Sequence, residues 1–90
     1  MDVSVLVPLF NEAESLPSLH AWIVRVMKEH ALSYEIVFVN DGSNDDSWQV
    51  IQSLREQDEH VKGICFRRNY GKSAALHCGF QMVQGDVVIT

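Results

Sequence analysis

The chain has 90 residues, 47% of them hydrophobic, and a formal net charge of −5 at pH 7. This length allows one small domain at most, and the apolar fraction is that of an ordinary globular core. The acidic balance argues against nonspecific binding over the whole surface to nucleic acid, so we expect no nucleic-acid partner. No apolar run approaches the ~20 residues of a membrane span, and the amino terminus lacks the layout of a signal peptide.

Charge and cysteine are unevenly placed along the chain. From Val61 onward four basic residues stand against one acidic residue, so this part carries +3 and the remainder −8. Cys65 and Cys78 fall in an apolar strand and an apolar-faced helix, which predicts buried free thiols. No Cys/His spacing suggests zinc. Both observations fit a reducing cytosol and predict a cytoplasmic protein.

The first third of the chain predicts a strand followed by a helix. Val3 to Pro8 is apolar, and we expect Pro8 to end the strand. Phe10 to Glu12 is then a short loop. The helix begins near Ser15, because Pro17 is tolerated only in a first helical turn. Its apolar stripe has helical spacing and comprises Leu16, Leu19, Ile23, Val26, Met27 and His30.

A second strand and helix follow. Tyr34 to Val39 contains an uninterrupted apolar run, which is typical of a buried parallel strand. The helix is predicted from Asp45 to about Asp58, with acidic residues at its start. Its inner edge is expected to comprise Trp48, Ile51, Leu54 and Arg55.

The last third predicts one more strand–helix pair and a final strand. Val61 to Phe66 is the third strand, residues 67–72 form a basic loop, and a helix runs from Ser73 to Gln84. Its expected buried face comprises Ala75, Leu76, Gly79, Phe80 and Val83. Gly85 and Asp86 turn the chain into a fourth strand, residues 87–90.

Strands that alternate with helices over short links predict an α/β fold with a parallel sheet and right-handed crossovers. We expect a three-layer, Rossmann-like α/β/α arrangement with strand order 3-2-1-4 and a switch point between strands one and four. The loops after strands one, two and three then open on the same edge of the sheet. The fourth strand reaches that edge at Thr90 without a loop of its own, so residues 1–90 are expected to be the amino-terminal portion of a larger domain.

The turn after the second strand is the most informative polar segment. It lies at the carboxyl end of a strand, where open α/β sheets bind ligands. Gly42 permits a tight turn that leaves the carboxylate of Asp41 pointing into the crevice. A simpler alternative is a capped strand-to-helix turn without a ligand, because Ser43, Asn44 and Asp45 are all good helix caps.

Three familiar phosphate-site motifs do not fit. Gly71-Lys72-Ser73 suggests a P-loop, but that motif needs a glycine five positions before Gly71, where the chain has Phe66. The loop after the first strand contains no glycine, which excludes a dinucleotide fingerprint. A phosphoacceptor receiver domain needs acidic residues after strand one and an aspartate at strand three, and strand three ends in two arginines.

Side chains from the three loops together suit a nucleotide. Glu12 and Asp41 supply carboxylates that can accept the N–H groups of a base and the hydroxyls of a ribose. The loop after the third strand supplies cations and an amide, in Arg67, Arg68, Asn69 and Lys72, and cations suit phosphate. The alternative is that the two arginines are solvated charges with no ligand.

Three ordered motifs resemble those of family 2 glycosyltransferases of the GT-A fold. They are Val7-Pro8-Leu9-Phe10-Asn11-Glu12, Val39-Asn40-Asp41-Gly42-Ser43 with Asp46 following, and residues 66–76, Phe-Arg-Arg-Asn-Tyr-Gly-Lys-Ser-Ala-Ala-Leu. The third looks most like the branch of dolichol-phosphate mannosyltransferases and bacterial undecaprenyl-phosphate sugar transferases. Residues 85–90 resemble the strand that leads into that family's Asp-x-Asp metal motif. The resemblance spans essentially the whole chain.

The resemblance implies nucleotide-binding roles for Pro8, Phe10, Glu12, Asp41, Gly71 and Lys72. Glu12 is expected at the ribose, Asp41 at the base, and Lys72 near the phosphates. Many relatives have Asp where this chain has Asn40, a departure that concerns only fine specificity.

The resemblance also implies an activity for the intact protein. It would transfer a sugar, with inversion, from a UDP- or GDP-sugar to an acceptor, in this branch a polyprenyl phosphate, in the synthesis of lipid-linked sugars or cell-envelope polysaccharide. A divalent metal, Mg²⁺ or Mn²⁺, would neutralise the leaving diphosphate. The Asp-x-Asp motif, the catalytic base and any membrane helices are expected beyond Thr90, so we expect no catalytic or metal-binding residue within these 90 residues and no turnover by them alone. The intact protein is expected at the cytoplasmic face of the membrane.

Two other function classes remain open from the residues themselves. One is a non-catalytic nucleotide-binding or regulatory α/β module, and the other is a structural domain whose loops bind nothing. Independently of function, the fourth strand would be an unprotected sheet edge, which predicts self-association through that edge.

Overall fold

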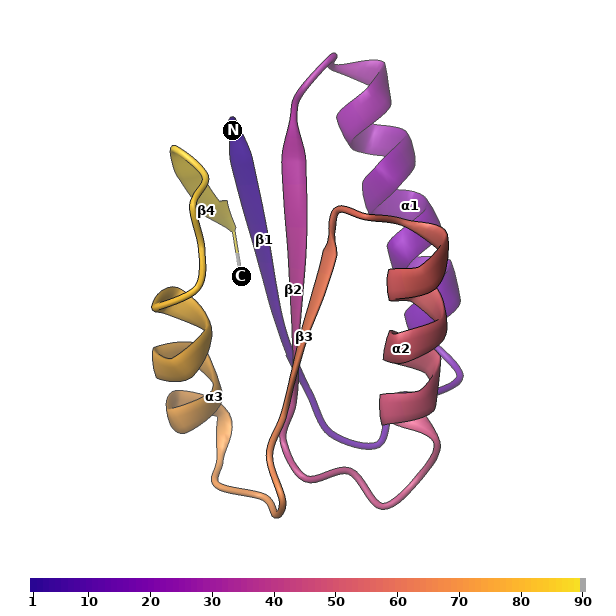
Figure 1. Ribbon diagram of the computed structural model, residues 1–90, viewed down its shortest axis with the longest axis vertical. Coiled ribbons are helices and arrows are strands. Elements are labelled where there is room, and N and C mark those ends of the chain that lie inside the picture. The colour runs from indigo at the N-terminus through magenta and orange to yellow at the C-terminus, as the bar shows by residue number, and fades with distance from the viewer. Residues whose placement is uncertain (90) are drawn as a thin grey trace.

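The computed structural model describes residues 1–89. Strands β1 (Val3–Leu9), β2 (Tyr34–Asn40), β3 (Val61–Cys65) and β4 (Val87–Ile89) form one parallel sheet in the order β3-β2-β1-β4. Helices α1 (Leu16–Glu29) and α2 (Ser47–Gln57) cover one face, and α3 (Lys72–Phe80) covers the other (Figure 1). The predicted parallel three-layer α/β/α architecture and strand order are confirmed.

The sheet separates two apolar clusters because successive side chains point to opposite faces. Val5, Ile36 and Phe38 belong to the cluster that α1 and α2 cover. Leu6 and Val37 belong to the cluster that also contains Ala75 of α3. All seven residues of β2 are buried, as expected for an inner parallel strand covered on both faces.

Strand β1 continues through Pro8 to Leu9, so the prediction that Pro8 ends the strand is wrong. The amide of Val3 and the carbonyl of Leu9 both bond toward β2. Even-numbered residues of β1 therefore direct their backbone groups to the opposite edge, where the described residues of β4 pair with Val3 to Val5. The missing N–H of Pro8 faces that edge, so β2 loses no hydrogen bond.

Helix boundaries differ from the prediction where side chains compete for the backbone. Helix α2 begins at Ser47 and not Asp45, because the Asp45 carboxylate accepts the Ser47 N–H. Helix α3 ends at Phe80, four residues before the predicted Gln84, because the chain beyond it bonds to the sheet instead. Thr90, the predicted last residue of the fourth strand, lies outside the described residues.

Several expected inner positions are exposed. Phe80 is 48% exposed, so it is not part of the buried face of α3. Arg55 is also exposed and lies away from the inner edge of α2. Cys65 is exposed because it ends an edge strand, whereas Cys78 is half-buried; both are free thiols, as predicted. Among residues 1–89, no helix is long and apolar enough to cross a membrane.

Candidate functional site

The three loops that follow β1, β2 and β3 lie together at one edge of the sheet, at the bottom of Figure 1. They are residues 10–15, 41–46 and 66–71. Parallel strands bring their carboxyl ends to the same edge, which is the predicted position of the site.

Asn11 connects the loop after β1 to the turn after β2. It adopts the left-handed conformation, with φ +53°, which asparagine tolerates better than most residues. Its N–H donates to Ser43 Oγ at 2.9 Å, and its Oδ1 accepts the N–H of Asn44 at 2.8 Å and of Asp45 at 3.3 Å. This role was not predicted from the sequence, although an asparagine two residues after a strand is a recognisable turn signal.

Asp45 strengthens the same connection. Its Oδ2 accepts the Ala13 N–H at 3.2 Å, and its Oδ1 accepts both the N–H and the hydroxyl of Ser47, at 2.9 and 2.5 Å. The Ser47 hydroxyl is the main cause that lowers the pKa of Asp45 below its usual value. Asp45 therefore stays ionised and holds two loops rather than facing a ligand.

Asp41 positions the basic loop that follows β3. Its Oδ1 accepts the N–H of Tyr70 at 2.8 Å, and its Oδ2 accepts the N–H of Gly71 at 3.0 Å. The residue is only 5% exposed. An ionised carboxylate has further acceptor capacity on both oxygens, so these bonds leave it able to accept a ligand's N–H.

Gly42 allows the two loops to approach this closely. Its φ is +73°, and a Cβ there would lie 2.1 Å from the carbonyl carbon of Arg68 and 2.3 Å from the amide nitrogen of Asn69. No side chain fits in that space. The predicted tight turn at Gly42 therefore also brings its backbone into contact with the backbone of the basic loop.

Gly71 turns the basic loop into α3. Its φ of +99° and ψ of 161° lie in a region that is essentially restricted to glycine. The turn makes Lys72 the first residue of α3 and directs the helix amino terminus to the sheet edge. Helix amino termini attract negative charge, and a lysine at this position adds to that attraction.

A cavity of about 310 Å³ lies between these loops. Its lining residues are Pro8, Leu9, Phe10, Asp41, Asn69, Gly71 and Lys72. The structure therefore brings together five of the six residues that the sequence analysis singled out. Leu9 is an addition, and Asn69 was recognised as part of the basic loop.

Glu12 is the predicted site residue that does not line this cavity. It lines a neighbouring hollow of about 240 Å³ with Ser15 and Asp45, among others. Its Oε2 accepts the Ser15 hydroxyl at 2.8 Å, and its N–H donates to Ser47 Oγ at 3.1 Å. Glu12 is exposed, and its predicted role at a ribose stays a prediction.

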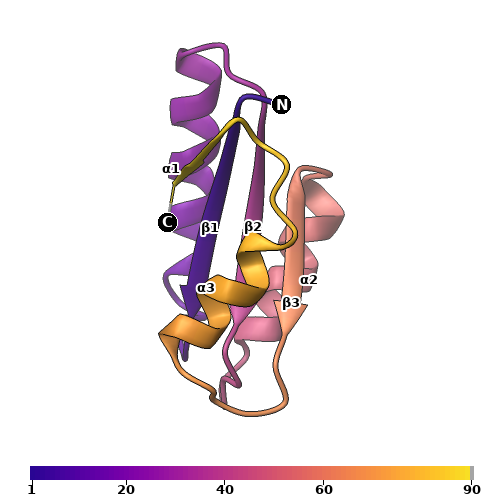
Figure 2. The ribbon, with the colours of Figure 1, turned by 90° about the vertical axis from the view of Figure 1, so that its left-hand side faces the viewer.

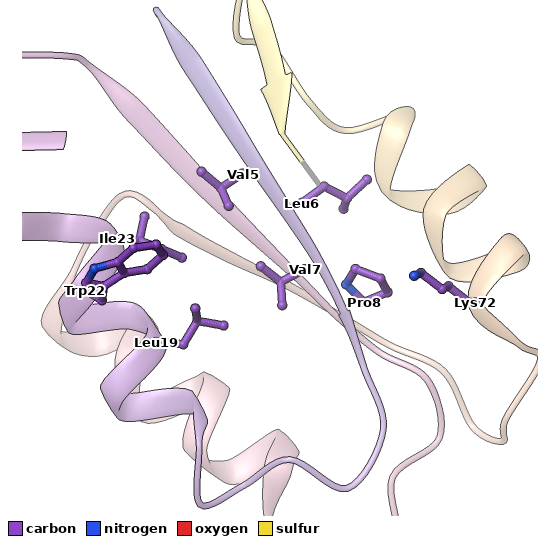
Figure 3. Close-up of a pocket in the computed structure, with 8 residues that line it drawn as sticks. All are labelled: Val5, Leu6, Val7, Pro8, Leu19, Trp22, Ile23 and Lys72. Carbon is purple, nitrogen blue, oxygen red and sulfur yellow. The ribbon is translucent and has the colours of Figure 1, made fainter. Parts of the chain in front are cut away.

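Lys72 also borders a second, apolar cavity of about 400 Å³ (Figure 3). Figure 3 shows the lysine amine pointing toward Pro8, with the side chains of Val7, Leu19 and Trp22 on the other side of β1. Pro8 and Lys72 line both cavities. The second cavity is therefore a hollow beside the edge of β1, next to the polar one.

Three other polar residues near the edge, Arg67, Arg68 and Asn40, lie outside the polar cavity. Arg67 and Arg68 do not line the 310 Å³ cavity, and the Arg68 guanidinium lies 4.8 Å from the ring centroid of Tyr70. Asn40 is buried, accepts the Ser43 N–H at 3.1 Å and donates to Cys65 Sγ at 3.7 Å. Its amide thus stabilises the turn.

The polar cavity combines the groups that a nucleotide needs. Phe10, 41% exposed, offers a face for a base, Asp41 offers an acceptor, and Lys72 with the start of α3 offers positive charge. Within residues 1–89, no three His, Cys, Asp or Glu side chains are placed to hold a metal ion. The groups that line the cavity are therefore of the kinds that can bind a nucleotide.

Comparison with solved structures supports the fold. The structure matches the S. aureus TarS 1–349 crystal structure with a TM-score of 0.80 and 22% identity, over 100% of this chain and 27% of that one. It matches the mannosyltransferase PcManGT from Pyrobaculum calidifontis, solved with GDP-Man and Mn²⁺, with a TM-score of 0.74 and 23% identity over 96% of this chain and 25% of that one. The predicted GT-A type of fold, with strand order 3-2-1-4, is confirmed.

Comparison of sequences identifies the family. An undecaprenyl-phosphate 4-deoxy-4-formamido-L-arabinose transferase from Pseudomonas fluorescens is 43% identical over 98% of this chain and 26% of its own length. The enzyme of the same name from Photorhabdus laumondii is 40% identical over 98% of this chain and 27% of its own. The chain thus spans about a quarter of these relatives. The family described as glycosyl transferase family 2 matches residues 4–90, and the chain belongs to that family.

Proposed function

We propose that this chain is the donor-nucleotide-binding part of an inverting glycosyltransferase that uses a UDP- or GDP-sugar. The observation that carries the proposal is the convergence of Phe10, Asp41 and Lys72 on one cavity at the carboxyl edge of a family 2 sheet. The base would stack against Phe10 and donate an N–H to Asp41. The diphosphate would lie toward Lys72 and the first turn of α3.

We further propose that the sugar acceptor of the intact protein is a polyprenyl phosphate. The support is that similar curated relatives are named undecaprenyl-phosphate sugar transferases and are about four times longer than this chain. The protein would then act at the cytoplasmic face of a membrane. An Asp-x-Asp motif just beyond Thr90 would hold Mg²⁺ or Mn²⁺, which would stabilise the leaving diphosphate as a Lewis acid.

A calorimetric titration of the chain with UDP, GDP and uridine tests the donor site. We expect UDP or GDP to bind, and Lys72→Met to weaken the diphosphate ligand about tenfold while hardly changing uridine, because a cation near phosphate contributes on the order of 1.5 kcal/mol. Lys28→Met, on the exposed face of α1, is the charge-matched control. Equal weakening by both variants, or no binding of either nucleotide, would refute the site.

A turnover assay tests the division of labour. With UDP- or GDP-sugars we expect no transfer by these 90 residues and transfer by a longer polypeptide that includes the metal motif. A measurable rate from the 90-residue chain would contradict the proposal. Binding of nucleotide without turnover by the longer polypeptide would instead favour the non-catalytic nucleotide-binding module.

We also propose that the 90-residue chain self-associates through the sheet edge formed by β4. Val87 and Val88 are 55% and 38% exposed, and the described residues of β4 pair on one side with Val3 to Val5 of β1. Exposed strand edges favour pairing with another chain. Sedimentation at increasing concentration should show dimers or larger species, and a monomer throughout would refute the proposal.

A further inference from the structure

Glu35 is a charged residue in the interior of the protein, on β2 and only 1% exposed. Alternation along β2 places it on the same face as Val37 and Val39, the face that α3 covers. Its Oε1 accepts the Lys62 ammonium of β3 at 2.7 Å. Its Oε2 accepts the Ser4 hydroxyl of β1 at 2.5 Å. Glu35 thus connects three neighbouring strands.

The same carboxylate bonds to the connection between α3 and β4. Glu35 Oε2 accepts the Gln84 N–H at 2.6 Å, and Ser4 Oγ accepts the Gly85 N–H at 2.8 Å. A Cβ on Gly85 would lie 2.5 Å from the Ser4 nitrogen, so the connection lies directly on β1. Figure 2 shows this connection crossing the α3 side of the sheet before it enters β4.

Burial of a charge is a poor way to gain stability. Replacing a buried ion pair by apolar residues is often neutral or stabilising, so stability alone does not explain Glu35. An apolar side chain there would leave the N–H of Gln84 without its acceptor. The network of hydrogen bonds therefore holds the connection into β4 at one position on the sheet.

Backbone bonds hold strand β4 against the start of β1, but its described side chains add little burial that would determine its register. Val87 and Val88 are 55% and 38% exposed. A slip of one residue in a strand moves every side chain to the opposite face. The partial burial of Val87 and Val88 is too small to prevent such a slip on its own.

We propose that Glu35 is a positioning residue whose ionised carboxylate, held by Lys62, sets the register of β4 on β1 through Ser4 and the Gln84–Gly85 connection. This inference does not depend on the proposed nucleotide. Strand β4 runs parallel to β1 toward the sheet edge that carries the 310 Å³ cavity. Its register therefore determines which face of the sheet the side chains at the end of β4 lie on, next to that cavity.

Site-resolved amide hydrogen exchange on the full chain tests the proposal. Ser4→Ala removes the bridge to Gly85 but keeps the Glu35–Lys62 pair, so the protein should remain folded. We expect exchange at Gly85, Asp86 and Val87 to become about tenfold faster, while the β2 amides of Ile36 and Val37 change by less than about twofold. Ser53→Ala, on the exposed face of α2, is the matched control and should change neither group.

A second pair of variants tests the charge itself. Lys62→Met should accelerate exchange at Asp86 and Val87 in the same selective way, whereas Lys28→Met should not, because it removes an equal charge far from the network. Glu35→Gln should resemble Lys62→Met. Acceleration of all amides by one common factor would show a purely global effect and overturn the proposal, as would unchanged β4 exchange in both Ser4→Ala and Lys62→Met.

Discussion

Replacement of Asp41 by alanine should separate the basic loop from the turn after β2. The carboxylate accepts two backbone N–H groups, from Tyr70 at 2.8 Å and Gly71 at 3.0 Å. A hydrogen bond to a charged group contributes about 1.5–3 kcal/mol, so the two together contribute about 3–6 kcal/mol. Because Gly71 lines the open cavity and its freed N–H can bind water, we expect the lower end, about 3 kcal/mol.

The free energy of unfolding from urea denaturation measures this loss, and a thermal midpoint lower by roughly 12 °C or more should accompany it. Asp46→Ala is the matched control, because the Asp46 side chain makes no capping hydrogen bond at the start of α2. It should cost no more than about 1 kcal/mol. Titration at a temperature where both variants are folded should show weaker binding of UDP and GDP for Asp41→Ala alone.

Equal stability and equal nucleotide binding of Asp41→Ala and Asp46→Ala would refute both proposed roles of Asp41. Lower stability with unchanged nucleotide affinity would leave Asp41 as a support for the loop but remove it from the base. The two roles can therefore be told apart by measuring both quantities on the same variant.

Further predictions concern two glycines and one partly buried acid. Gly71→Ala should destabilise the protein by about 1–3 kcal/mol through backbone strain alone, because nothing lies within 4 Å of the added Cβ. Gly42→Ala adds a clash with the backbone of Arg68 and should cost more in the same urea experiment; an equal or smaller loss would contradict the close loop contact. Burial raises the pKa of Asp58, but hydrogen bonds from the His60 N–H, His20 and Tyr34 outweigh it, so the pKa lies below its usual value. Ionised Asp58 therefore stabilises the fold above about pH 4, and this contribution disappears as the pH falls through the lowered pKa. Asp58→Asn should flatten the acid side of a stability–pH curve, and an unchanged slope there would refute this account.

The backbone arrangement was predictable from sequence because its determinants are local. Uninterrupted apolar runs specify buried parallel strands, and short links between alternating strands and helices leave few topologies. The same reasoning placed Asp41, Gly71 and Lys72 at one edge, since the carboxyl ends of parallel strands meet there.

The details that the sequence did not predict depend on contacts between distant segments. Asn11 acquires its role only when Ser43 and Asn44 lie beside it, and α3 stops early because Glu35 and Ser4 bond the chain that follows. Arg68 turned out to lie on Tyr70 rather than in the cavity. Composition and periodicity contain no signal for such pairings, which become visible only when the strands are in register.

Pro8 has a consequence for any polypeptide that extends the sheet along the open side of β1. Pro8 has no backbone N–H, so one carbonyl group of such a strand has no hydrogen-bond donor there. This lowers the stability of the pairing by about 1 kcal/mol or more. The ladder of hydrogen bonds is thereby interrupted beside the polar cavity, and the added strand is free to bend away from β1 at the level where Phe10 and Lys72 begin. Pro8 therefore limits how far along β1 an added strand can form a continuous ladder of hydrogen bonds.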